Sequence, residues 1–365
     1  MHADSPPLPE ALGDTAALGA FLRARGILDE PFTAAAIGDG HSNLTFVITG
    51  VESGRRVVLR RPPDHGSGSY DVLREARFIQ ALAGTTVPVP RVLATADPLN
   101  DGGAPLPVAC FVETYVPGVV VTTATPDALA DPATRLRCGL AMADALATLH
   151  AVDPERARRG GPGSASSADG RAHAGPRDGS DPGQTGPNRR LVERLARLVQ
   201  TDDGEVEGRF RPAHDWLLAH APAAGERRIV HGDYRLGNIM FDPSSPGRIA
   251  AILDWELATI GDPRIDLAWM LLCTPDPGEP PLPIHALDAA LAEQGWPSRA
   301  ALLERYEAAA GHAPGPLEWF TVLAAWKLAA LYAYSARTSA DPYYDDDTHV
   351  TRFLDAANRR AGIAA

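Results

Sequence analysis

Two short segments of the chain place acidic and amide side chains directly after apolar runs that have the composition of β-strands. Residues 231–238 read H-G-D-Y-R-L-G-N, and residues 254–256 read D-W-E. In this pattern Asp233 can orient a hydroxyl nucleophile, while Asn238 and Asp254 can hold Mg²⁺ against the phosphates of a nucleotide. Phosphoryl transfer asks little more of a protein than such positioning and charge neutralisation. The spacing therefore predicts a kinase active site.

The first segment also has simpler interpretations. The tripeptide H-G-D alone could be a turn in which Asp233 caps a helix and Gly232 has a positive φ angle. The D-x-x-x-x-N spacing and the second acid after the next strand favour the catalytic interpretation. A metal-hydrolase site on His231 and Asp233 is less well supported, because no second group of His or Cys ligands lies at a usable spacing. We expect His231 to be structural.

The composition is that of an ordinary globular chain. Its 365 residues suffice for one large bilobal domain or two smaller ones, and 45% hydrophobic residues can form a substantial core. The net charge of −12 argues against a nucleic-acid partner and against a membrane-surface protein. No apolar run approaches the length of a membrane span, and the first residues do not resemble a secretion signal. The three cysteines show no paired pattern, so we expect a reduced, cytoplasmic protein whose oligomeric state stays open.

Residues 1–115 have the pattern of a small antiparallel sheet with two helices. We expect a helix over 15–25, a strand-turn-strand segment over 37–48, a strand over 55–61, a helix over 71–84 and a strand over 108–115. The turn between the first two strands contains Gly40, Ser42 and Asn43. Such residues let the backbone approach a phosphate, but an ordinary hairpin turn uses the same residue types. The turn alone leaves both interpretations open.

The third expected strand carries arginines where a kinase needs a cation. In a kinase this strand supplies a lysine that contacts the α and β phosphates and pairs with a glutamate of the following helix. Here the strand ends in Arg60 and Arg61, and the helix contains Glu75. Arginine can take this role because its planar fork binds phosphate in a bidentate manner. Alternation along the strand favours Arg60 as the residue that faces the cleft, with Arg61 as the alternative.

Residues 116–365 are predicted to be mainly helical. Apolar residues recur at helical spacing over 132–150, 189–200, 212–220, 264–273, 285–294, 299–310, 316–338 and 348–361. Residues 159–188 contain hardly any large apolar side chain, so burial cannot offset the entropy of ordering and we expect a disordered insertion. The predicted fold is α+β and protein-kinase-like. It has a small antiparallel-sheet N-lobe (1–115) and a larger, mainly helical C-lobe (116–365).

Several motifs in sequence order together resemble one known family. They are the G-x-S-N-x-T-F turn, V-L-R-R-P-P, the R-E helix, V-P-V-P-R at 87–91, H-G-D-Y-R-L-G-N-I-M-F, and I-L-D-W-E-L-A-T-I-G-D-P-R-I-D-L-A. They resemble the aminoglycoside phosphotransferase and choline kinase-like family over nearly the whole chain outside 159–188. Within it they most closely resemble the branch that includes the kinase domain preceding some acyl-CoA dehydrogenases.

The resemblance implies a kinase-like fold, ATP or GTP and Mg²⁺ as cofactors, and transfer of phosphate to a hydroxyl group of a small molecule. It implies that Asp233 acts on the acceptor hydroxyl and that Asn238 and Asp254 bind the metal. The nucleotide would be contacted by Gly40, Ser42, Asn43, Arg60, Glu75, Glu113 and Tyr115, the last two at the adenine-binding hinge. Asp266 resembles an acid that fixes the catalytic loop, although a helix cap accounts for it equally well.

The resemblance leaves the acceptor open. Members of the family act on aminoglycosides, other antibiotics, choline-like alcohols, sugars and hydroxylated acyl-CoA. The branch favours a hydroxyacyl-CoA or a hydroxy acid, with an antibiotic as the alternative. The acids at 345–347 could attract a cationic acceptor, but a solvated helix start is the simpler interpretation. Lys327 and Arg337 lie on an aromatic, core-like helix and could serve an anionic acceptor.

Two other classes of protein share these features. A catalytically inactive kinase-like binding module would keep the fold, but the intact Asp233, Asn238 and Asp254 argue against it. A protein kinase would need an A-P-E segment and an activation loop after Asp254, and the sequence G-D-P follows too closely at residues 261–263. A small-molecule kinase is therefore the preferred hypothesis.

Overall fold

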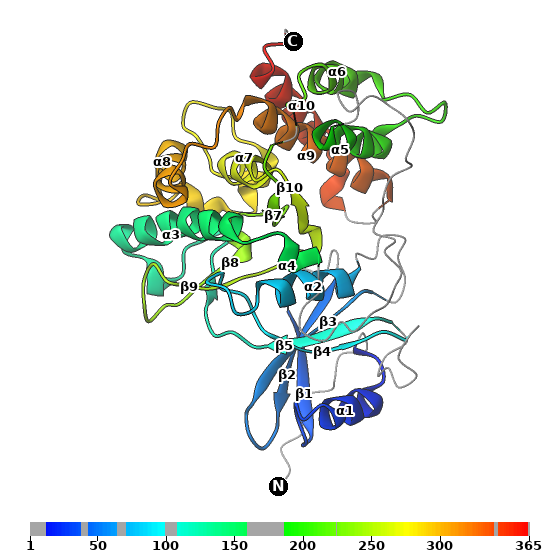
Figure 1. The fold of residues 1–365 in the computed structure, drawn as a ribbon, viewed down its shortest axis with the longest axis vertical. Helices are drawn as coiled ribbons and strands as arrows, with labels where there is room; N and C mark the ends of the chain where they lie inside the picture. Colours follow the sequence, from blue (N-terminus) through cyan, green and yellow to red (C-terminus); the bar gives the residue numbers. More distant parts are fainter. Residues whose placement is uncertain are drawn as a thin grey trace. The chain divides into compact units, whose positions relative to one another are not determined.

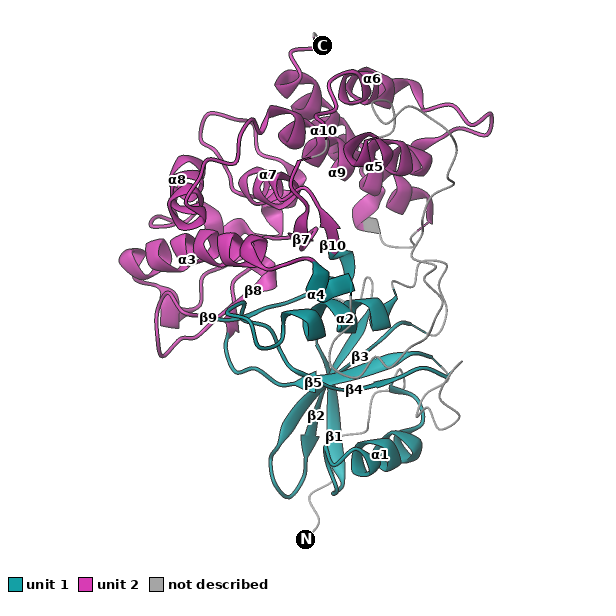
Figure 2. Ribbon diagram, viewed as in Figure 1, with its two compact units in different colours: residues 1–118, 155–164, 250–258 teal, residues 119–154, 165–249, 259–365 magenta. Residues whose placement is uncertain are grey.

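The computed structural model describes residues 12–37, 43–63, 71–98, 108–158, 186–223, 225–338 and 342–363 (Figure 1). The chain forms two compact units (Figure 2). Unit 1 comprises residues 1–118, 155–164 and 250–258, and unit 2 comprises 119–154, 165–249 and 259–365. The predicted lobes followed chain order, whereas unit 1 also takes in two later segments of the chain. The second of these segments carries Asp254.

Unit 1 is built on five antiparallel strands in the order β1-β2-β3-β5-β4. They are β1 (Phe32–Ile37), β2 (Leu44–Gly50), β3 (Arg56–Arg61), β4 (Val92–Ala96) and β5 (Cys110–Thr114). Strand alternation points Val57 and Leu59 of β3 into an apolar core with helix α1 (Thr15–Ala24). Arg60 directly follows Leu59 in the strand, so its side chain leaves the opposite face of the sheet.

Helix α2 (Val72–Leu82) supplies the acid that meets this arginine. Asp71 caps its first turn by accepting hydrogen bonds from the backbone N–H groups of Leu73 and Arg74, each 3.0 Å long. The helix buries Glu75. The short 3₁₀ helix Trp255–Leu257 packs on α2, where Arg74 donates a 3.2 Å hydrogen bond to the carbonyl of Glu256. The segment after Asp254 is thereby part of unit 1.

Unit 2 is mainly helical, and its largest core surrounds α9. Its α-helices are α3 (Pro132–Ala151), α5 (Pro187–Ala196), α6 (Arg211–Ala219), α7 (Arg264–Cys273), α8 (Arg299–Ala310), α9 (Glu318–Thr338) and α10 (Asp347–Arg360). Trp319 and Trp326 of α9 are buried, and their indole N–H groups donate to the carbonyls of Leu217 and Phe210 at 2.9 and 3.1 Å. Both tryptophans of this helix are therefore core, as expected.

Short strands of unit 2 hold the loop that carries the H-G-D motif. Strand β7 (Arg228–Val230) pairs antiparallel with β10 (Thr259–Gly261), and β8 (Ile239–Phe241) pairs with β6 (Val119–Val120). Residues 231–238 connect β7 to β8, so both ends of the loop are fixed by backbone pairing.

The structure corrects two predictions, one about a helix and one about the end of the insertion. Residues 285–294 do not form an α-helix but two 3₁₀ turns, Pro283–Ala286 and Ala289–Ala292, because Asp288 between them has non-helical angles (φ −123°, ψ 42°). The expected insertion also ends earlier than residue 188, since Asn188 is buried in α5 and donates a 3.3 Å hydrogen bond to the carbonyl of Pro222. Residues 159–185 of that insertion lie outside the described residues.

None of the helices in the described part of the chain combines the length and apolar character of a membrane span. The described cysteines, Cys110, Cys138 and Cys273, are buried and free, as the sequence predicted. Unit 1 contains the first of them in β5, and unit 2 contains the other two. They take no part in the sites below.

Candidate active site

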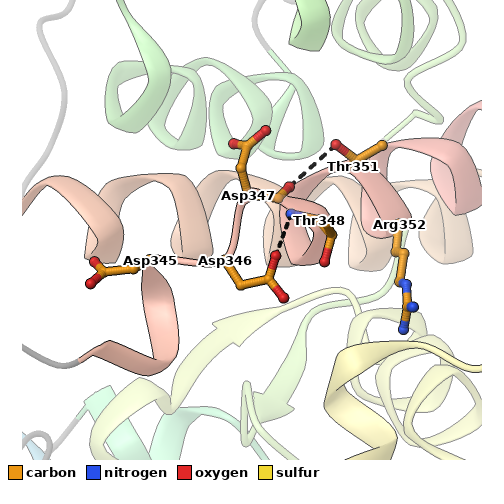
Figure 3. A pocket seen from close by; sticks show the side chains of 6 residues that line it. All are labelled: Asp345, Asp346, Asp347, Thr348, Thr351 and Arg352. Carbon is orange, nitrogen blue, oxygen red and sulfur yellow. Dashed lines mark hydrogen bonds between the residues drawn. The ribbon is translucent and has the colours of Figure 1, made fainter.

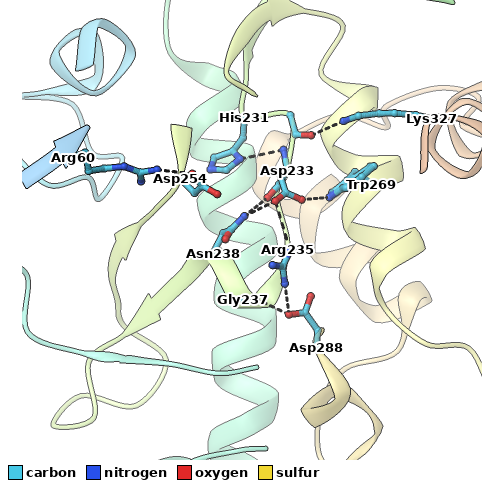
Figure 4. A network of polar contacts seen from close by, with 11 residues as sticks. Arg60, His231, Asp233, Arg235, Gly237, Asn238, Asp254, Trp269, Asp288 and Lys327 are labelled. Carbon is cyan, nitrogen blue, oxygen red and sulfur yellow. Dashed lines mark hydrogen bonds and ion pairs between the residues drawn. The ribbon is translucent and has the colours of Figure 1, made fainter. Parts of the chain in front are cut away.

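The carboxylate of Asp233 is held in a defined orientation within unit 2 (Figure 4). The indole Nε1–H of Trp269 donates to its Oδ1 at 2.8 Å, and the amide Nδ2 of Asn238 donates to its Oδ2 at 2.8 Å. Its side chain is 21% exposed, so a small molecule can still reach it. A carboxylate that is both fixed and accessible can align a hydroxyl nucleophile.

The amide of Asn238 is oriented by the same loop. Its Nδ2 donates to the backbone oxygen of Asp233 at 2.9 Å as well as to the carboxylate. Both amide hydrogens are then used, and the Oδ1 accepts no hydrogen bond from any residue that the structure describes. An uncharged oxygen presented in this way is a ligand type that Mg²⁺ accepts.

The backbone of this loop is anchored by Asp266 of α7. Its fully buried carboxylate accepts hydrogen bonds from the N–H groups of His231 (2.6 Å) and Gly232 (2.8 Å). Burial alone would raise the pKa of Asp266, but the contact with His150 and the N–H of Gly232 lower it below its usual value. Of the two interpretations of Asp266, the geometry thus supports the one in which it fixes the loop.

Lys327 holds the loop from a second side. Its ammonium group donates to the carbonyl of Gly232 at 2.9 Å and lies 4.1 Å from the ring centroid of Trp269. Burial lowers the pKa of Lys327. Gly232 has a φ angle of 88°, so glycine is needed at this turn. From the sequence, Lys327 was considered as a group for an anionic acceptor. In the structure it contacts Gly232, which precedes Asp233, and Trp269, which donates to the Asp233 carboxylate.

In unit 1 the guanidinium of Arg60 joins two acids, of which Figure 4 shows Asp254. Its Nη1 lies 3.0 Å from Oε1 of Glu75, and its Nη2 lies 3.0 Å from Oδ1 of Asp254. Asp254 has a φ angle of 65°, the one positive value among the described non-glycine residues. Arg61 is fully buried on the other face of the sheet and donates to the carbonyl of Pro62 at 3.0 Å. Arg60 is thus the arginine that meets Glu75, as strand alternation predicted.

The remaining candidate nucleotide-binding residues have mixed surroundings. Asn43 is buried, and its Nδ2 lies 3.5 Å from Oε2 of Glu75, at the outer limit of a hydrogen bond. Gly40 and Ser42 lie outside the described residues. The ring of Tyr115 stacks with Arg56, whose guanidinium carbon is 3.9 Å from the ring centroid.

Glu113 is buried on the same face of the sheet as Arg60, because it pairs with Val58 across β3 and β5. Its Oε2 has no hydrogen-bond partner within the described ranges. Burial raises the pKa of Glu113 to about 7, against the opposing effect of Arg60, and burial likewise raises the pKa of Glu75 to about 8. Unit 1 thus gathers three acids around one arginine.

We expect Glu113→Gln to reduce the pH dependence of stability. Because the pKa of Glu113 is about 7 in the folded protein and 4.5 in an unfolded chain, the folded state binds the proton more tightly. The favourable contribution of Glu113 to the free energy of unfolding is complete below pH 4.5. It is lost as the pH rises through 7, a change of roughly 3 kcal/mol.

Urea unfolding at pH 5 and pH 8 measures this effect. The stability of Glu113→Gln relative to the unmutated protein should improve at pH 8, whereas exposed Glu304→Gln should follow the unmutated protein at both values. An equal pH dependence for all three proteins would show that Glu113 keeps an ordinary acidity.

The acids at the start of α10 line a surface depression with Thr348, Thr351 and Arg352 (Figure 3). Asp346 caps the helix by accepting from the N–H of Thr348 at 2.9 Å, and Asp347 pairs with Arg209 at 2.6 Å. These contacts support the interpretation of residues 345–347 as a helix-start cluster.

The sheet of unit 1 and the helices of unit 2 are those of a protein-kinase-like fold. The chain belongs to the phosphotransferase enzyme family, whose model matches residues 33–302. Acyl-CoA dehydrogenase family member 10 of Mus musculus is 30% identical over 251 residues, which cover 66% of this chain and 20% of that protein. The chain spans between a fifth and a third of the length of this and the next curated relatives.

Two solved structures share the fold. Aminoglycoside phosphotransferase APH(4)-Ia, in a ternary complex with ADP and hygromycin B, superposes with a TM-score of 0.56 at 19% identity, covering 96% of this chain and 100% of that one. The ethanolamine kinase of Plasmodium vivax gives 0.59 at 10% identity, covering 94% and 87%. At these identities the similarity concerns the fold alone. The predicted fold class is confirmed.

Trp269, which donates to Asp233, was not singled out from the sequence, and neither were Arg235 of the same loop and Asp288, which form an ion pair at 2.7 Å. Trp269 lies among the apolar residues of α7, where its period marks it as core. Arg235 lies inside the H-G-D motif, so its position between Asp233 and Asn238 was a usable signal. Asp288 lies in an alanine-rich segment and carries no local signal.

Proposed function

We propose that this chain is an ATP-dependent, Mg²⁺-dependent phosphotransferase that transfers the γ-phosphoryl group to a hydroxyl group of a small molecule. The observation that carries the proposal is the orientation of the Asp233 carboxylate by Asn238 and Trp269 in a chain of the phosphotransferase enzyme family. ADP in the complex of the related fold supports a nucleotide cofactor. GTP is the alternative nucleotide.

In this proposal Asp233 receives the hydroxyl hydrogen of the acceptor. One carboxylate oxygen is engaged by Trp269 and the other by Asn238, and both keep lone pairs, so the hydroxyl can donate to the exposed edge of the group. The proton can pass to Asp233 as the bond to phosphorus forms. Asp233 therefore orients the nucleophile first and accepts its proton afterwards.

The other candidate residues would serve the nucleotide and the metal. The described residues contain no group of three or more His, Cys, Asp or Glu side chains arranged for a metal. Mg²⁺ in nucleotide sites commonly takes only one or two protein ligands besides phosphate and water, and the Oδ1 of Asn238 and the carboxylate of Asp254 fit that need. When bound, Mg²⁺ would offset negative charge on the phosphates.

Arg60, held by Glu75, would contact the phosphates of the nucleotide. Asn43, with Gly40 and Ser42, would form the phosphate loop. Glu113 and Tyr115 would lie at the nucleobase.

For the acceptor we propose a hydroxyacyl-CoA or a related hydroxy acid. The support comes from the curated relatives, which are acyl-CoA dehydrogenase family members, over a part of their length. An aminoglycoside or another antibiotic is the alternative, in line with the fold shared with a hygromycin B complex.

The test is a panel of hydroxyacyl-CoA esters, free hydroxy acids and aminoglycosides with Mg-ATP or Mg-GTP and the unmutated chain. Acceptor-dependent ADP release and a phosphorylated product with the CoA esters would support the proposal, and the Asp233→Asn variant is the matched control. Product only with aminoglycosides would reassign the acceptor. Nucleotide binding without product from any acceptor would instead indicate a kinase-like binding module.

A further inference from the structure

A second acid reaches the loop between Asp233 and Asn238. The Oδ1 of Asp288 accepts hydrogen bonds from Nη1 of Arg235 at 2.7 Å and from the backbone N–H of Gly237 at 2.9 Å (Figure 4). One carboxylate oxygen thus contacts two residues that lie inside the Asp-x-x-x-x-Asn interval. Asp288 is positioned by the junction of the two 3₁₀ turns described above.

The environment of Asp288 is unfavourable for a carboxylate. The residue is fully buried, and its Oδ2 has no hydrogen-bond partner in the described parts of the chain. Burial raises its pKa to about 6, although Arg235 acts in the opposite direction. A buried ion pair of this kind contributes little to stability compared with an apolar pair of similar size. Stability alone is therefore a weak explanation for an acid at this position.

A side chain at position 237 would disturb the same contact. A Cβ atom there would lie 2.4 Å from Nη1 of Arg235 and 2.9 Å from Oδ1 of Asp288. Both distances are shorter than van der Waals contact, so an alanine here would require the ends of the Arg235 and Asp288 side chains to shift. The backbone of the loop and the ion pair fit each other closely.

Arg235 has a second acid within reach. Its Nε forms an ion pair with Oδ2 of Asp233 at 3.6 Å, a distance too long for a hydrogen bond, whereas its Nη1 is hydrogen-bonded to Asp288 at 2.7 Å. Coulomb attraction rises as two charges approach, and a guanidinium engages a carboxylate best with two parallel hydrogen bonds. Without Asp288, Arg235 would therefore move from the 3.6 Å ion pair into direct hydrogen bonds with Asp233 and cover the exposed edge of the carboxylate, to which the acceptor hydroxyl is proposed to donate.

We propose that Asp288 is a positioning residue that holds Arg235 away from the carboxylate of Asp233. It acts through Arg235 and through the N–H of Gly237, and it keeps the edge of Asp233 open for the acceptor. This role in catalysis rests on the proposed function, but the contact itself exists without a nucleotide or an acceptor.

The indole N–H of Trp269 reports on the contact, because it donates to Asp233. The chain has six tryptophans, so ¹⁵N-tryptophan labelling gives few indole signals, and Trp269→Phe identifies the relevant one. In Asp288→Asn the amide oxygen can still accept from Gly237, but the charge that holds Arg235 is gone. We expect the Trp269 signal to shift in this variant as Arg235 closes on Asp233.

Two further variants make the result specific. In Arg235→Gln/Asp288→Asn no guanidinium remains, so the Trp269 signal should return toward its position in the unmutated protein. Gly237→Ala pushes Arg235 and Asp288 apart while it keeps the charge of Asp288, and it should produce a shift like that of Asp288→Asn. An unshifted Trp269 signal in folded Asp288→Asn, or an equal shift in the double variant, would overturn the proposal.

Kinetic measurements then separate the positioning role of Asp288 from the proposed phosphotransferase function. If the unmutated protein releases ADP from Mg-ATP in the acceptor panel, Asp288→Asn should lower kcat about tenfold while both KM values stay within about twofold. An unchanged kcat would contradict the positioning role. If the unmutated protein releases no ADP, the proposed function fails, and the indole signals still decide whether Asp288 restrains Arg235.

Discussion

Replacement of Asp233 by asparagine is expected to lower kcat about a thousandfold, within the range for the loss of a general base, while Mg-ATP binding stays near that of the unmutated protein. Asparagine preserves the size of the side chain and can still accept the hydrogen bond from Trp269 through its amide oxygen. It cannot take up a proton at neutral pH. The loss should therefore fall on the step in which the acceptor hydroxyl is deprotonated.

The measurement compares kcat and both KM values for the acceptor found in the panel, together with calorimetric titration of Mg-ATP. Exposed Asp215 of α6 offers a matched control, since Asp215→Asn makes the same chemical change away from the loop. A kcat for Asp233→Asn close to that of the unmutated protein would mean that another acid receives the proton. A large rise in the acceptor KM with kcat preserved would instead assign Asp233 to ground-state binding.

Features that depend on local periodicity could be predicted from the sequence. Alternation in β3 separates Arg60 from Leu59 and Arg61, and this alone put Arg60 on the face where Glu75 and Asp254 lie. The Asp-x-x-x-x-Asn interval likewise brings Asp233 and Asn238 into contact, because both lie on one short loop between two strands. In each case the relevant distance is set by a few residues of backbone.

The supports of the loop depend on tertiary packing, and the sequence does not encode them locally. Trp269 reaches Asp233 from the middle of a helix in which the residues on either side of it in the sequence are apolar, so helical period assigns it only to the core. The sequence did not single out Asp288, because the pattern of residues 285–294 wrongly predicted an α-helix. In such a helix this acid would be an ordinary polar position. The break at Asp288 turns its side chain inward to Arg235.

The same packing explains why one side chain can serve more than one neighbour. Lys327 both donates to Gly232 and lies over the ring of Trp269, so the residue that precedes Asp233 and the residue that donates to its carboxylate share a support. Asp266 holds the other peptide groups of the turn. A loop held in this way can present a partly exposed carboxylate without losing its geometry, which is the condition for preorganised catalysis.

The conformation of Asp254 decides how its role should be tested. Its φ of 65° and ψ of 67° are left-handed, which most residues with a side chain avoid and which asparagine and aspartate tolerate best. Asp254→Ala would therefore add backbone strain of roughly 1 kcal/mol to the loss of the carboxylate. Asp254→Asn removes the charge alone and leaves the backbone preference intact.

We expect Asp254→Asn to weaken Mg-ATP binding at least about tenfold and to lower turnover below detection, because a neutral amide oxygen is a much poorer partner for Mg²⁺ than a carboxylate. Arg60 keeps its 3.0 Å contact with Glu75, so the clamp on the phosphates should survive the substitution. Binding of ATP without Mg²⁺ should then change little. This difference between metal-bound and metal-free nucleotide is the signature of a lost metal ligand.

Calorimetric titrations with ATP in Mg²⁺ and in EDTA measure both affinities on the same preparations. Glu52→Gln, at an exposed position of unit 1, is the control for the loss of one negative charge. Equal weakening with and without Mg²⁺ would indicate that the folded site has been disturbed. An unchanged affinity for Mg-ATP would remove Asp254 from the metal site, and the D-W-E segment would then act only through its ion pair with Arg60.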